Sequence, residues 1–367
     1  METEKRIVLT VTNDLTYDQR MQKVCRSLSN AGYEVELVGR KRDFSLPIQI
    51  EPYRQTRLRC FFNKGKLFYL EYNIRLLFYL AFLNFDIVCA VDLDTVVPAA
   101  IIGKLKGAHI VFDAHEYFSE TPEVVRRPMV KKIWEWVDKT FVPQFDLIYT
   151  VSPTLAELFS KRYGKPVHVI LNVPVLEIRE PQYYFRLPDT LIYQGALNEG
   201  RGLEHLIEAM QSLDARLLIA GEGDLSNQLR EMVFKMNLGH KVEFLGWVLP
   251  DHMAKITEQA DIGIHVSVNK GLSYYHSLGN KFFNYIHAGI PQICTTYPEY
   301  RRINDEYEVA LLIRDNSSAE IVKAVQKLQD NRELYVRLKN NCLSCSRAYN
   351  WQNQEVKLLN LYDQLYK

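Results

Sequence analysis

The chain has 367 residues, of which 47% are hydrophobic and 24% are charged, and its formal net charge is +1. This composition is typical of a globular protein and this length favours two domains, because a single hydrophobic core rarely grows so large. The near-zero charge gives no support to a general polyanion-binding role.

Short apolar runs alternate with longer helical patterns along the first half of the chain. The segment 17–32 predicts a helix, with Met21, Val24, Cys25 and Leu28 on one face. Nearly continuous apolar runs predict parallel strands covered on both faces, over 6–12, 33–39, 85–91, 108–113 and 145–152. Such alternation indicates strand–helix–strand crossovers and a doubly wound sheet.

The segment 171–189 contains three prolines and no helical period, which predicts a linker. The alternation then restarts, with strands expected over 190–196, 215–223, 241–247, 261–268 and 291–296. We therefore predict an α/β protein with two doubly wound, Rossmann-like domains that face a central cleft. The expected boundaries are 1–173 for the N-terminal domain, 174–189 for the linker, 190–345 for the C-terminal domain and 346–367 for a final helix.

Ligands of doubly wound sheets bind at the carboxyl ends of the strands. No glycine follows the first strand, which argues against NAD or FAD in the first domain. Asp14, Asp18 and Arg20 follow it instead and can bind a hydroxylated ligand, although capping by Asp18 and a solvated Arg20 are equally consistent. After 85–91, helix capping by Asp94 or Thr95 is the favoured interpretation, with Asp94 also near the cleft.

His115 directly follows the strand 108–113. A histidine there is suited to a sugar hydroxyl or a phosphate, and a purely structural role is equally consistent. In the second domain, Gly195 allows close approach to the backbone, and Arg201 opens a helix, which favours an anion site.

Two further glycines, Gly221 and Gly223, form a tight turn, and Trp247 follows the next strand and suits a flat base. At a later helix start, Gly279, Asn280 and Lys281 offer backbone donors and a cation for a diphosphate. Asn284 lies one turn further along and suits a ribose hydroxyl.

The order of these motifs resembles glycosyltransferase family 4, retaining enzymes with the GT-B fold. The likeness covers nearly the whole chain and rests on "VDLDTVVPA", "IVFDAHEYFSETPE", "LIYQGALNEGRGLEHLIEAM", "LLIAGEGDL", "VEFLGWV" and "GNKFFNYIHAGIPQI". It implies sugar transfer from a UDP- or GDP-sugar to a glycan or lipid-linked acceptor in polysaccharide or glycoconjugate biosynthesis. It also implies that the N-terminal domain is the acceptor side, that the C-terminal domain binds the nucleotide-sugar, and that the final helix crosses back to the first domain.

The resemblance implies that His115 faces the transferred sugar and Arg201 holds the donor phosphates, as the two catalytic residues. Asn280 and Lys281 would line the diphosphate, and the glycines 221 and 223 and Trp247 would lie near the base. Two positions depart from the family. Ala196 stands where an arginine is frequent, and His276 and Asn284 stand where two glutamates are frequent. His276 cannot replace a carboxylate, so the donor is left open.

No cofactor and no metal are expected, and no nucleic-acid partner. The "CLSC" segment at 342–345 has no second ligand pair nearby, so we predict two cysteines on a helix surface. Two alternatives to a transferase remain: a GT-B sugar-nucleotide epimerase or hydrolase, and a non-catalytic nucleotide-sugar-binding subunit.

The start of the chain lacks the features of a signal peptide and no stretch suits a membrane span, so the expected location is cytoplasmic. Basic and aromatic residues mix in 64–82 and 126–139. Such surfaces suit contact with an anionic membrane, which would make the protein peripheral at the plasma membrane, and ordinary core-facing helices are equally consistent.

Overall fold

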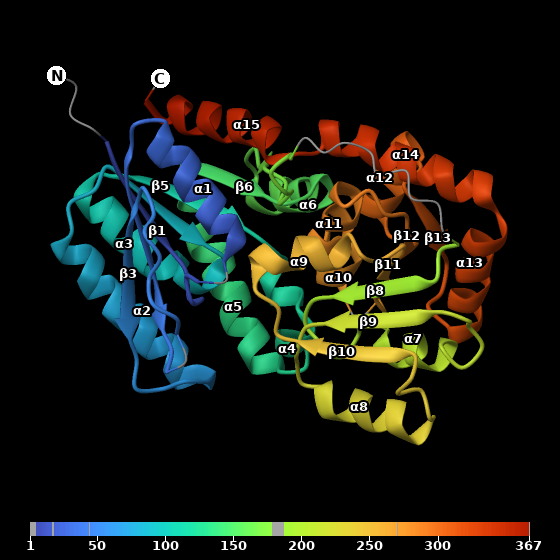
Figure 1. Cartoon of the computed structure of the whole chain (residues 1–367). Coiled ribbons are helices and arrows are strands. Elements are labelled where there is room, and N and C mark those ends of the chain that lie inside the picture. Colours follow the sequence, from blue (N-terminus) through green and yellow to red (C-terminus); the bar gives the residue numbers. More distant parts are fainter. Residues whose placement is uncertain (1–4, 17, 44, 178–186, 270, 367) are drawn as a thin grey trace. The chain divides into compact units, whose positions relative to one another are not determined.

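The computed structural model describes residues 5–16, 18–43, 45–177, 187–269 and 271–366 (Figure 1). The chain divides into two compact units. The first unit comprises Met1–Asn172 and Asn353–Lys367, and the second comprises Val173–Gln352. The predicted linker, 174–189, includes 178–186, which lie outside the described residues.

The first unit contains a seven-stranded parallel sheet in the order β3-β2-β1-β4-β5-β6-β7. Its strands are β1 (Arg6–Thr10), β2 (Glu34–Lys41), β3 (Arg54–Arg59), β4 (Ile87–Val91), β5 (His109–Ala114), β6 (Leu147–Thr150) and β7 (His168–Val169). The helices of this unit are α1 (Gln19–Asn30), α2 (Gly65–Phe82), α3 (Val96–Lys106), α4 (Pro122–Val125), α5 (Pro128–Phe141), α6 (Pro153–Tyr163) and α15 (Trp351–Asp363), the last of which begins at the unit boundary.

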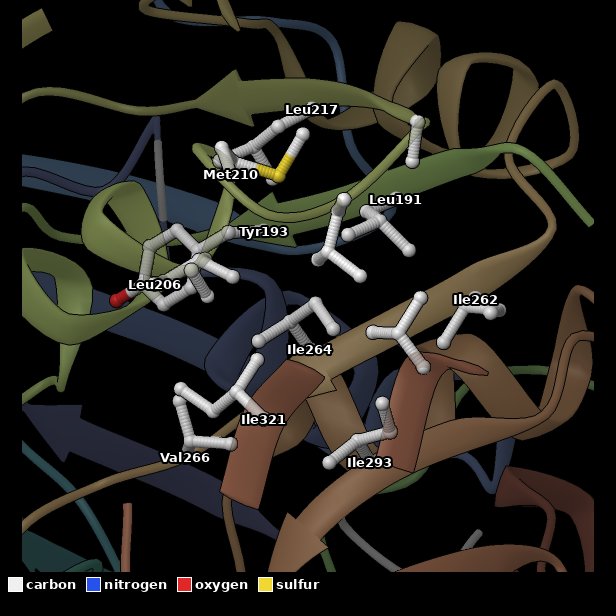
Figure 2. Packing of buried hydrophobic residues seen from close by; sticks show 14 of the residues in the cluster. Leu191, Tyr193, Leu206, Met210, Leu217, Ile262, Ile264, Val266, Ile293 and Ile321 are labelled. Carbon is white, nitrogen blue, oxygen red and sulfur yellow. The ribbon is translucent and has the colours of Figure 1, made fainter. Parts of the chain in front are cut away.

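The second unit contains a six-stranded parallel sheet in the order β10-β9-β8-β11-β12-β13. Its strands are β8 (Thr190–Gln194), β9 (Arg216–Ala220), β10 (Val242–Gly246), β11 (Ile262–His265), β12 (Gln292–Thr295) and β13 (Ala310–Ile313). Its helices are α7 (Leu203–Ala209), α8 (Ser226–Lys235), α9 (Pro250–Thr257), α10 (Leu272–Tyr275), α11 (Asn280–His287), α12 (Pro298–Tyr307), α13 (Ser318–Asp330) and α14 (Arg332–Ala348). Figure 2 shows the core between β8, β9, β11 and β12 and the neighbouring helices, where Leu191, Ile264 and Ile293 are fully buried.

Both sheets are α/β and doubly wound, as predicted. The central strands form because their apolar residues are covered on both faces of the sheet. The strand order reverses between β1 and β4 in the first unit and between β8 and β11 in the second. At such a reversal the loops after the two strands diverge and leave room for a ligand. A ligand is therefore expected beside the segments that follow Thr10, Val91, Gln194 and His265.

The cysteines of "CLSC" lie on α14, but Cys342 and Cys345 are both fully buried, so the predicted surface position is wrong. They pack inward because the helix lies against α11 and α12. In the final helix, Leu358, Leu361 and Tyr362 are buried, whereas Val356 is exposed. Among the described residues, no helix is long and apolar enough to cross a membrane.

Candidate functional site

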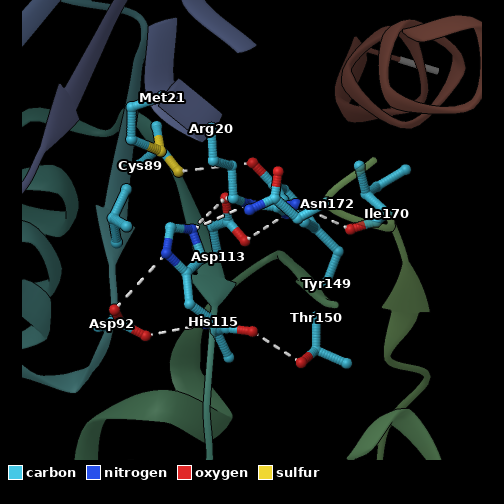
Figure 3. A network of polar contacts seen from close by, with 12 residues as sticks. Arg20, Met21, Cys89, Asp92, Asp113, His115, Tyr149, Thr150, Ile170 and Asn172 are labelled. Carbon is cyan, nitrogen blue, oxygen red and sulfur yellow. Dashed lines mark hydrogen bonds and ion pairs between the residues drawn. The ribbon is translucent and has the colours of Figure 1, made fainter. Parts of the chain in front are cut away.

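Arg20, Asp113 and His115 form the centre of a polar network at the carboxyl ends of β1, β4 and β5 (Figure 3). Arg20 Nη2 donates to Asp113 Oδ1 at 2.9 Å, and Arg20 Nε donates to Asp113 Oδ2 at 3.2 Å. Arg20 also donates to the carbonyl of Ile170 at 3.0 Å. Arg20 is buried, so the predicted alternative of a solvated arginine is wrong.

The imidazole of His115 lies between two carboxylates. Nε2 is 3.1 Å from Asp113 Oδ2, and Nδ1 is 3.7 Å from Asp92 Oδ2. Burial disfavours the charged imidazole, but the charges of Asp113 and Asp92 outweigh it and raise the pKa of His115 to about 9. The charged imidazole is therefore favoured at neutral pH, with Asp113 Oδ2 at 3.1 Å and Arg20 Nε at 3.0 Å from its Nε2.

Asp92 also fixes the main chain at Asp113 and His115 through two hydrogen bonds. Its Oδ1 accepts from the His115 N–H at 2.8 Å, and its own N–H donates to the Asp113 carbonyl at 2.9 Å. Asp92 adopts φ +56°, a conformation that non-glycine residues rarely take and that costs about 1–3 kcal/mol. Such strain is retained where surrounding contacts fix a side chain for function.

Asp94 does not cap a helix. Its Oδ2 accepts from Thr12 Oγ1 at 2.5 Å, and the Thr95 hydroxyl donates to the carbonyls of Thr10 and Val91, so the favoured capping interpretation is wrong. Burial, assisted by the charge of Asp92, raises the pKa of Asp94 to about 7. Asp94 is therefore partly protonated near neutral pH.

The other predicted first-domain residues are engaged structurally. Asp18 caps α1, where its Oδ1 accepts from the Met21 N–H at 3.1 Å. Asp14 accepts from Thr16 and Ser45 and lies 3.2 Å from Arg57 Nη2. Burial alone would raise the pKa of Asp14, but these partners hold it below its ordinary value.

Lys23, which sequence reasoning missed, lies one turn after Arg20 on α1. Its Nζ donates to Asn172 Oδ1 at 3.1 Å. Burial, followed by the charge of Arg20, lowers the pKa of Lys23 to about 7. A lysine on the polar side of an ordinary amphipathic helix gives no sequence signal of this environment.

In the second unit, Lys281 and Arg201 form a cationic cluster at the carboxyl end of β8. Lys281 Nζ lies 3.8 Å from the ring centroid of Tyr193, and Arg201 Cζ lies 4.7 Å from that of Tyr274. Burial, followed by the charge of Arg201, lowers the pKa of Lys281 well below its ordinary value. Two neighbouring cations on aromatic faces are a suitable arrangement for an anion.

Glycines keep the space beside this cluster open. A Cβ on Gly195 would lie 3.5 Å from Lys281 Nζ, and one on Gly221 would lie 2.0 Å from the Gly195 carbonyl oxygen. A Cβ on Gly223 would lie 2.4 Å from Asn198 Oδ1. The tight turn predicted at 221–223 is therefore packed directly against the segment after β8. Trp247, which follows β10, is 79% exposed, so its ring is accessible to a flat ligand.

At the start of α11, the backbone N–H groups that the sequence predicted as diphosphate donors are not all available. The Gly279 N–H donates to the Tyr300 hydroxyl at 3.0 Å, so this predicted phosphate donor already has a partner. Asn280 is exposed, and Lys281 and Asn284 are half-buried on the same helix. His276 is half-buried after α10, with its ring 5.1 Å from that of Tyr275.

His265, the last residue of β11, is a polar residue that the sequence analysis missed. It is 2% exposed, and its Nε2 lies 3.3 Å from the Tyr300 hydroxyl. The segment "IGIHVSV" has the pattern of a buried strand, which conceals the single imidazole in it. In the described part of the chain, no group of three or more His, Cys, Asp or Glu side chains is placed to hold a metal ion.

Comparison with known families matches both halves of the chain. A family model described as "Glycosyltransferase Family 4" matches residues 19–173, and one described as "Glycosyl transferases group 1" matches residues 179–343. Two proteins of Methanocaldococcus jannaschii, both named as uncharacterized glycosyltransferases, are also similar. One, MJ1607, is 25% identical over 177 residues, which are 47% of this chain and 44% of that protein. The other, MJ1178, is 24% identical over 222 residues, which are 60% of each.

The alignments thus span less than two thirds of either relative. Among solved structures, sucrose-phosphate synthase from Thermosynechococcus elongatus has a TM-score of 0.80 at 18% identity, covering 99% of both chains. Anabaena HepE in complex with UDP has a TM-score of 0.74 at 12% identity, covering 98% of this chain and 100% of the other. A further HepE structure contains UDP-glucose. At these identities the likeness concerns the fold, which is GT-B.

Proposed function

The chain belongs to the family 4 glycosyltransferases, and on that premise we propose that it transfers a sugar from a nucleotide-sugar donor to a glycan or lipid-linked acceptor. The observation that carries the proposal is the position of Lys281, with its ammonium over Tyr193 and beside the bare backbone of Gly195. Arg201 supplies a second charge to the same cluster. A diphosphate needs such paired cations, and UDP is the favoured nucleotide because a structural neighbour holds it.

The reaction proceeds with retention at the anomeric carbon. The bond between that carbon and the phosphate oxygen breaks, and the acceptor oxygen bonds to the carbon on the same face. The acceptor proton passes to an oxygen of the departing diphosphate, so no protein nucleophile is needed. The leaving diphosphate gathers negative charge. Arg201 and Lys281, which takes up a proton when the diphosphate binds, stabilise this charge in a partly buried environment.

His115 acts on the transferred sugar in this proposal. Its Nδ1 is 3.7 Å from Asp92 Oδ2, which is too long for a hydrogen bond, so the Nδ1–H is left for a sugar hydroxyl. Asp113 fixes the other ring nitrogen. The side chain is 20% exposed, which permits this contact.

A membrane surface is the second partner that we propose. The exposed apolar residues of α2 recur every three or four positions, which places Leu67, Leu70, Ile74, Phe78 and Phe82 along one outer stripe. Helix α3 packs against both α2 and α5 and adds exposed Ile101 and Leu105, and α5 adds Met129, Ile133 and Trp136. We call these ten residues the outer apolar surface.

Basic side chains border this surface. Lys64, Lys66, Lys104, Lys106 and Lys132 are all exposed on or next to the same three helices. A groove at the end of α2 joins Phe78 and Phe82 to three arginines, Arg54, Arg59 and Arg75. Apolar side chains bordered by cations suit the boundary between acyl chains and anionic headgroups. A lipid-linked acceptor would be presented at such a surface.

The test is a thermal-shift panel with UDP-, GDP-, ADP- and TDP-sugars, followed by product analysis. A ligand bound by the folded state alone raises the melting temperature. We expect one nucleotide class to do so, and Lys281→Met to abolish the shift while Lys235→Met, on exposed α8, retains it. Release of free sugar from donor alone would favour a hydrolase, and binding without turnover on any acceptor would favour a non-catalytic subunit. No shift with any nucleotide would contradict the proposal.

A further inference from the structure

His265 occupies an unusual position for a titratable side chain. It ends the central strand β11 at the strand-order reversal and is 2% exposed. Its ring contacts that of Tyr300 edge to face, with centroids 4.7 Å apart. A Cβ on Gly279 would lie 3.1 Å from His265 Cε1, so the start of α11 lies directly against the imidazole.

The hydrogen bonds around Tyr300 are compatible with a proton on Nδ1 of this histidine. The Tyr300 oxygen accepts from the Gly279 N–H at 3.0 Å and lies 3.3 Å from His265 Nε2. A phenol oxygen that accepts an N–H can still donate its own proton, and His265 Nε2 is an acceptor within reach. Burial, followed by the charges of Lys281 and Arg201, lowers the pKa of His265 well below its ordinary value and keeps the ring neutral. A neutral ring that accepts at Nε2 carries its proton on Nδ1.

This Nδ1–H is buried and has no hydrogen-bond partner among the residues that the structure describes. Buried donors in folded proteins are nearly always satisfied, so this one requires an explanation. The two charges that act on the ring belong to Lys281 and Arg201, the cations assigned above to the donor diphosphate.

We propose that His265 is a donor-binding residue whose Nδ1–H donates to an oxygen of the donor's diphosphate. The inference rests on the proposed function, since it needs a nucleotide-sugar at the cluster of Lys281 and Arg201. A neutral imidazole adds a hydrogen bond there without a third positive charge, which the two neighbouring cations would oppose. Tyr300 is the positioning residue, because its hydroxyl holds the ring in the donating tautomer.

The test compares two amide substitutions of similar size. In His265→Asn the amide nitrogen takes the place of Nδ1, and in His265→Gln it takes the place of Nε2. The affinity for UDP, or for the nucleotide that stabilises the wild-type chain, is measured by calorimetry beside the corresponding nucleoside. We expect His265→Gln to weaken nucleotide binding by about 10- to 100-fold, the range for a hydrogen bond to a charged group. His265→Asn should stay within about threefold, and nucleoside binding should not change in either variant.

A measurement on the wild-type chain removes any dependence on how the variants fold. With ¹⁵N-labelled histidine, the His265 signal should show a proton on Nδ1, and that proton should move downfield when the nucleotide is added. If Nδ1 carries no proton, or if nucleotide leaves it unchanged, the inference is wrong while the proposed function stands. If His265→Gln binds the nucleotide as tightly as the wild-type chain, the inference is likewise wrong and the proposed function stands. If the wild-type chain binds no nucleotide, the inference and the proposed function fail together.

Discussion

Arg20 in the first turn of α1 and Asp113 near the end of β5 form a buried ion pair with two hydrogen bonds, although 93 residues separate them in the sequence. Their side chains are 3% and 0% exposed. Burial favours protonation of Asp113, but Arg20 and His115 outweigh it and hold the pKa of this carboxyl at about 2. The pair therefore joins a helix, a strand and the candidate catalytic histidine in one charged unit.

Removing Arg20 should destabilise the first unit strongly. In Arg20→Met the Asp113 carboxylate stays buried without its main partner, which costs about 3–5 kcal/mol. Urea-induced unfolding measures this loss. The double variant Arg20→Met/Asp113→Asn should lose less than the sum of the two single changes, because the orphaned charge is gone.

The same substitution at Arg26 is the matched control, because Arg26 lies on the same helix. Arg26 Nη2 contacts Glu51 at 2.6 Å, but its side chain is 47% exposed. Arg26→Met should cost less than about 1 kcal/mol. Equal losses at Arg20 and Arg26 would show that burial of the Arg20 pair has no energetic consequence.

His115 should make stability depend on pH. Its pKa is about 9 in the folded state against an ordinary value of 6.5, so the folded state binds the proton more tightly. The resulting stabilisation is complete below about pH 6.5 and is lost as the pH rises through 9. The gap in unfolding free energy between wild type and His115→Gln should shrink by roughly 3 kcal/mol between pH 6 and 10. A constant gap over this range would contradict the assigned imidazolium.

Lys281 should couple nucleotide binding to proton uptake. Its pKa is depressed without ligand, and a bound diphosphate favours the charged ammonium. Affinity should therefore fall as the pH rises through the depressed pKa, with a proton taken up on binding. Calorimetry in two buffers of different ionisation enthalpy measures the uptake, which Lys235→Met should preserve. Release of a proton on binding would contradict the assignment of Lys281 as a group that becomes charged when the diphosphate binds.

Gly202 should tolerate no side chain. It has φ +74°, and a Cβ there would lie 2.1 Å from the Val266 carbonyl oxygen. Gly202→Ala should destabilise the second unit by about 2 kcal/mol or more, through backbone strain and a clash with main chain. Gly164→Ala is the control for backbone strain alone, because Gly164 has φ +67° and a Cβ there would have no atom within 4 Å. This change should cost about 1 kcal/mol. Equal losses at the two positions would show that the clash relaxes.

The sequence predicted the buried strands well, because a continuous apolar run such as 108–113 is enough to identify a strand covered on both faces. It did not predict β3, β7 or β13, which are all edge strands. The residues of β3, "RQTRLR", are charged and partly exposed. An edge strand pairs on one side and needs no apolar run, which explains why the pattern of apolar residues does not reveal β3.

The sequence identified candidate site residues whose role follows from their own segment. It missed those whose environment depends on residues far along the chain. Arg201 and Lys281 stand at helix starts, from which the sequence analysis predicted anion binding, and the structure brings the two side chains into one cluster. The capping expected of Asp94 failed because Thr12, on a different loop, binds its carboxylate. His265 and Lys23 owe their environments to residues far along the chain, Tyr300 and Asn172, which no single segment contains.

The outer apolar surface should bind anionic membranes. Leu70 and Phe78 are each 59% exposed, and burying such a side chain contributes about 1–2 kcal/mol. The wild-type chain should co-sediment with phosphatidylglycerol vesicles, less so in high salt, and hardly with phosphatidylcholine vesicles. Leu70→Glu/Phe78→Glu should weaken this binding by at least about tenfold. Phe234→Glu, at an 81% exposed position on α8 of the second unit, should bind like wild type. Equal co-sedimentation with both lipids, or none with either, would remove the membrane from the proposed function and leave a soluble glycan as the acceptor.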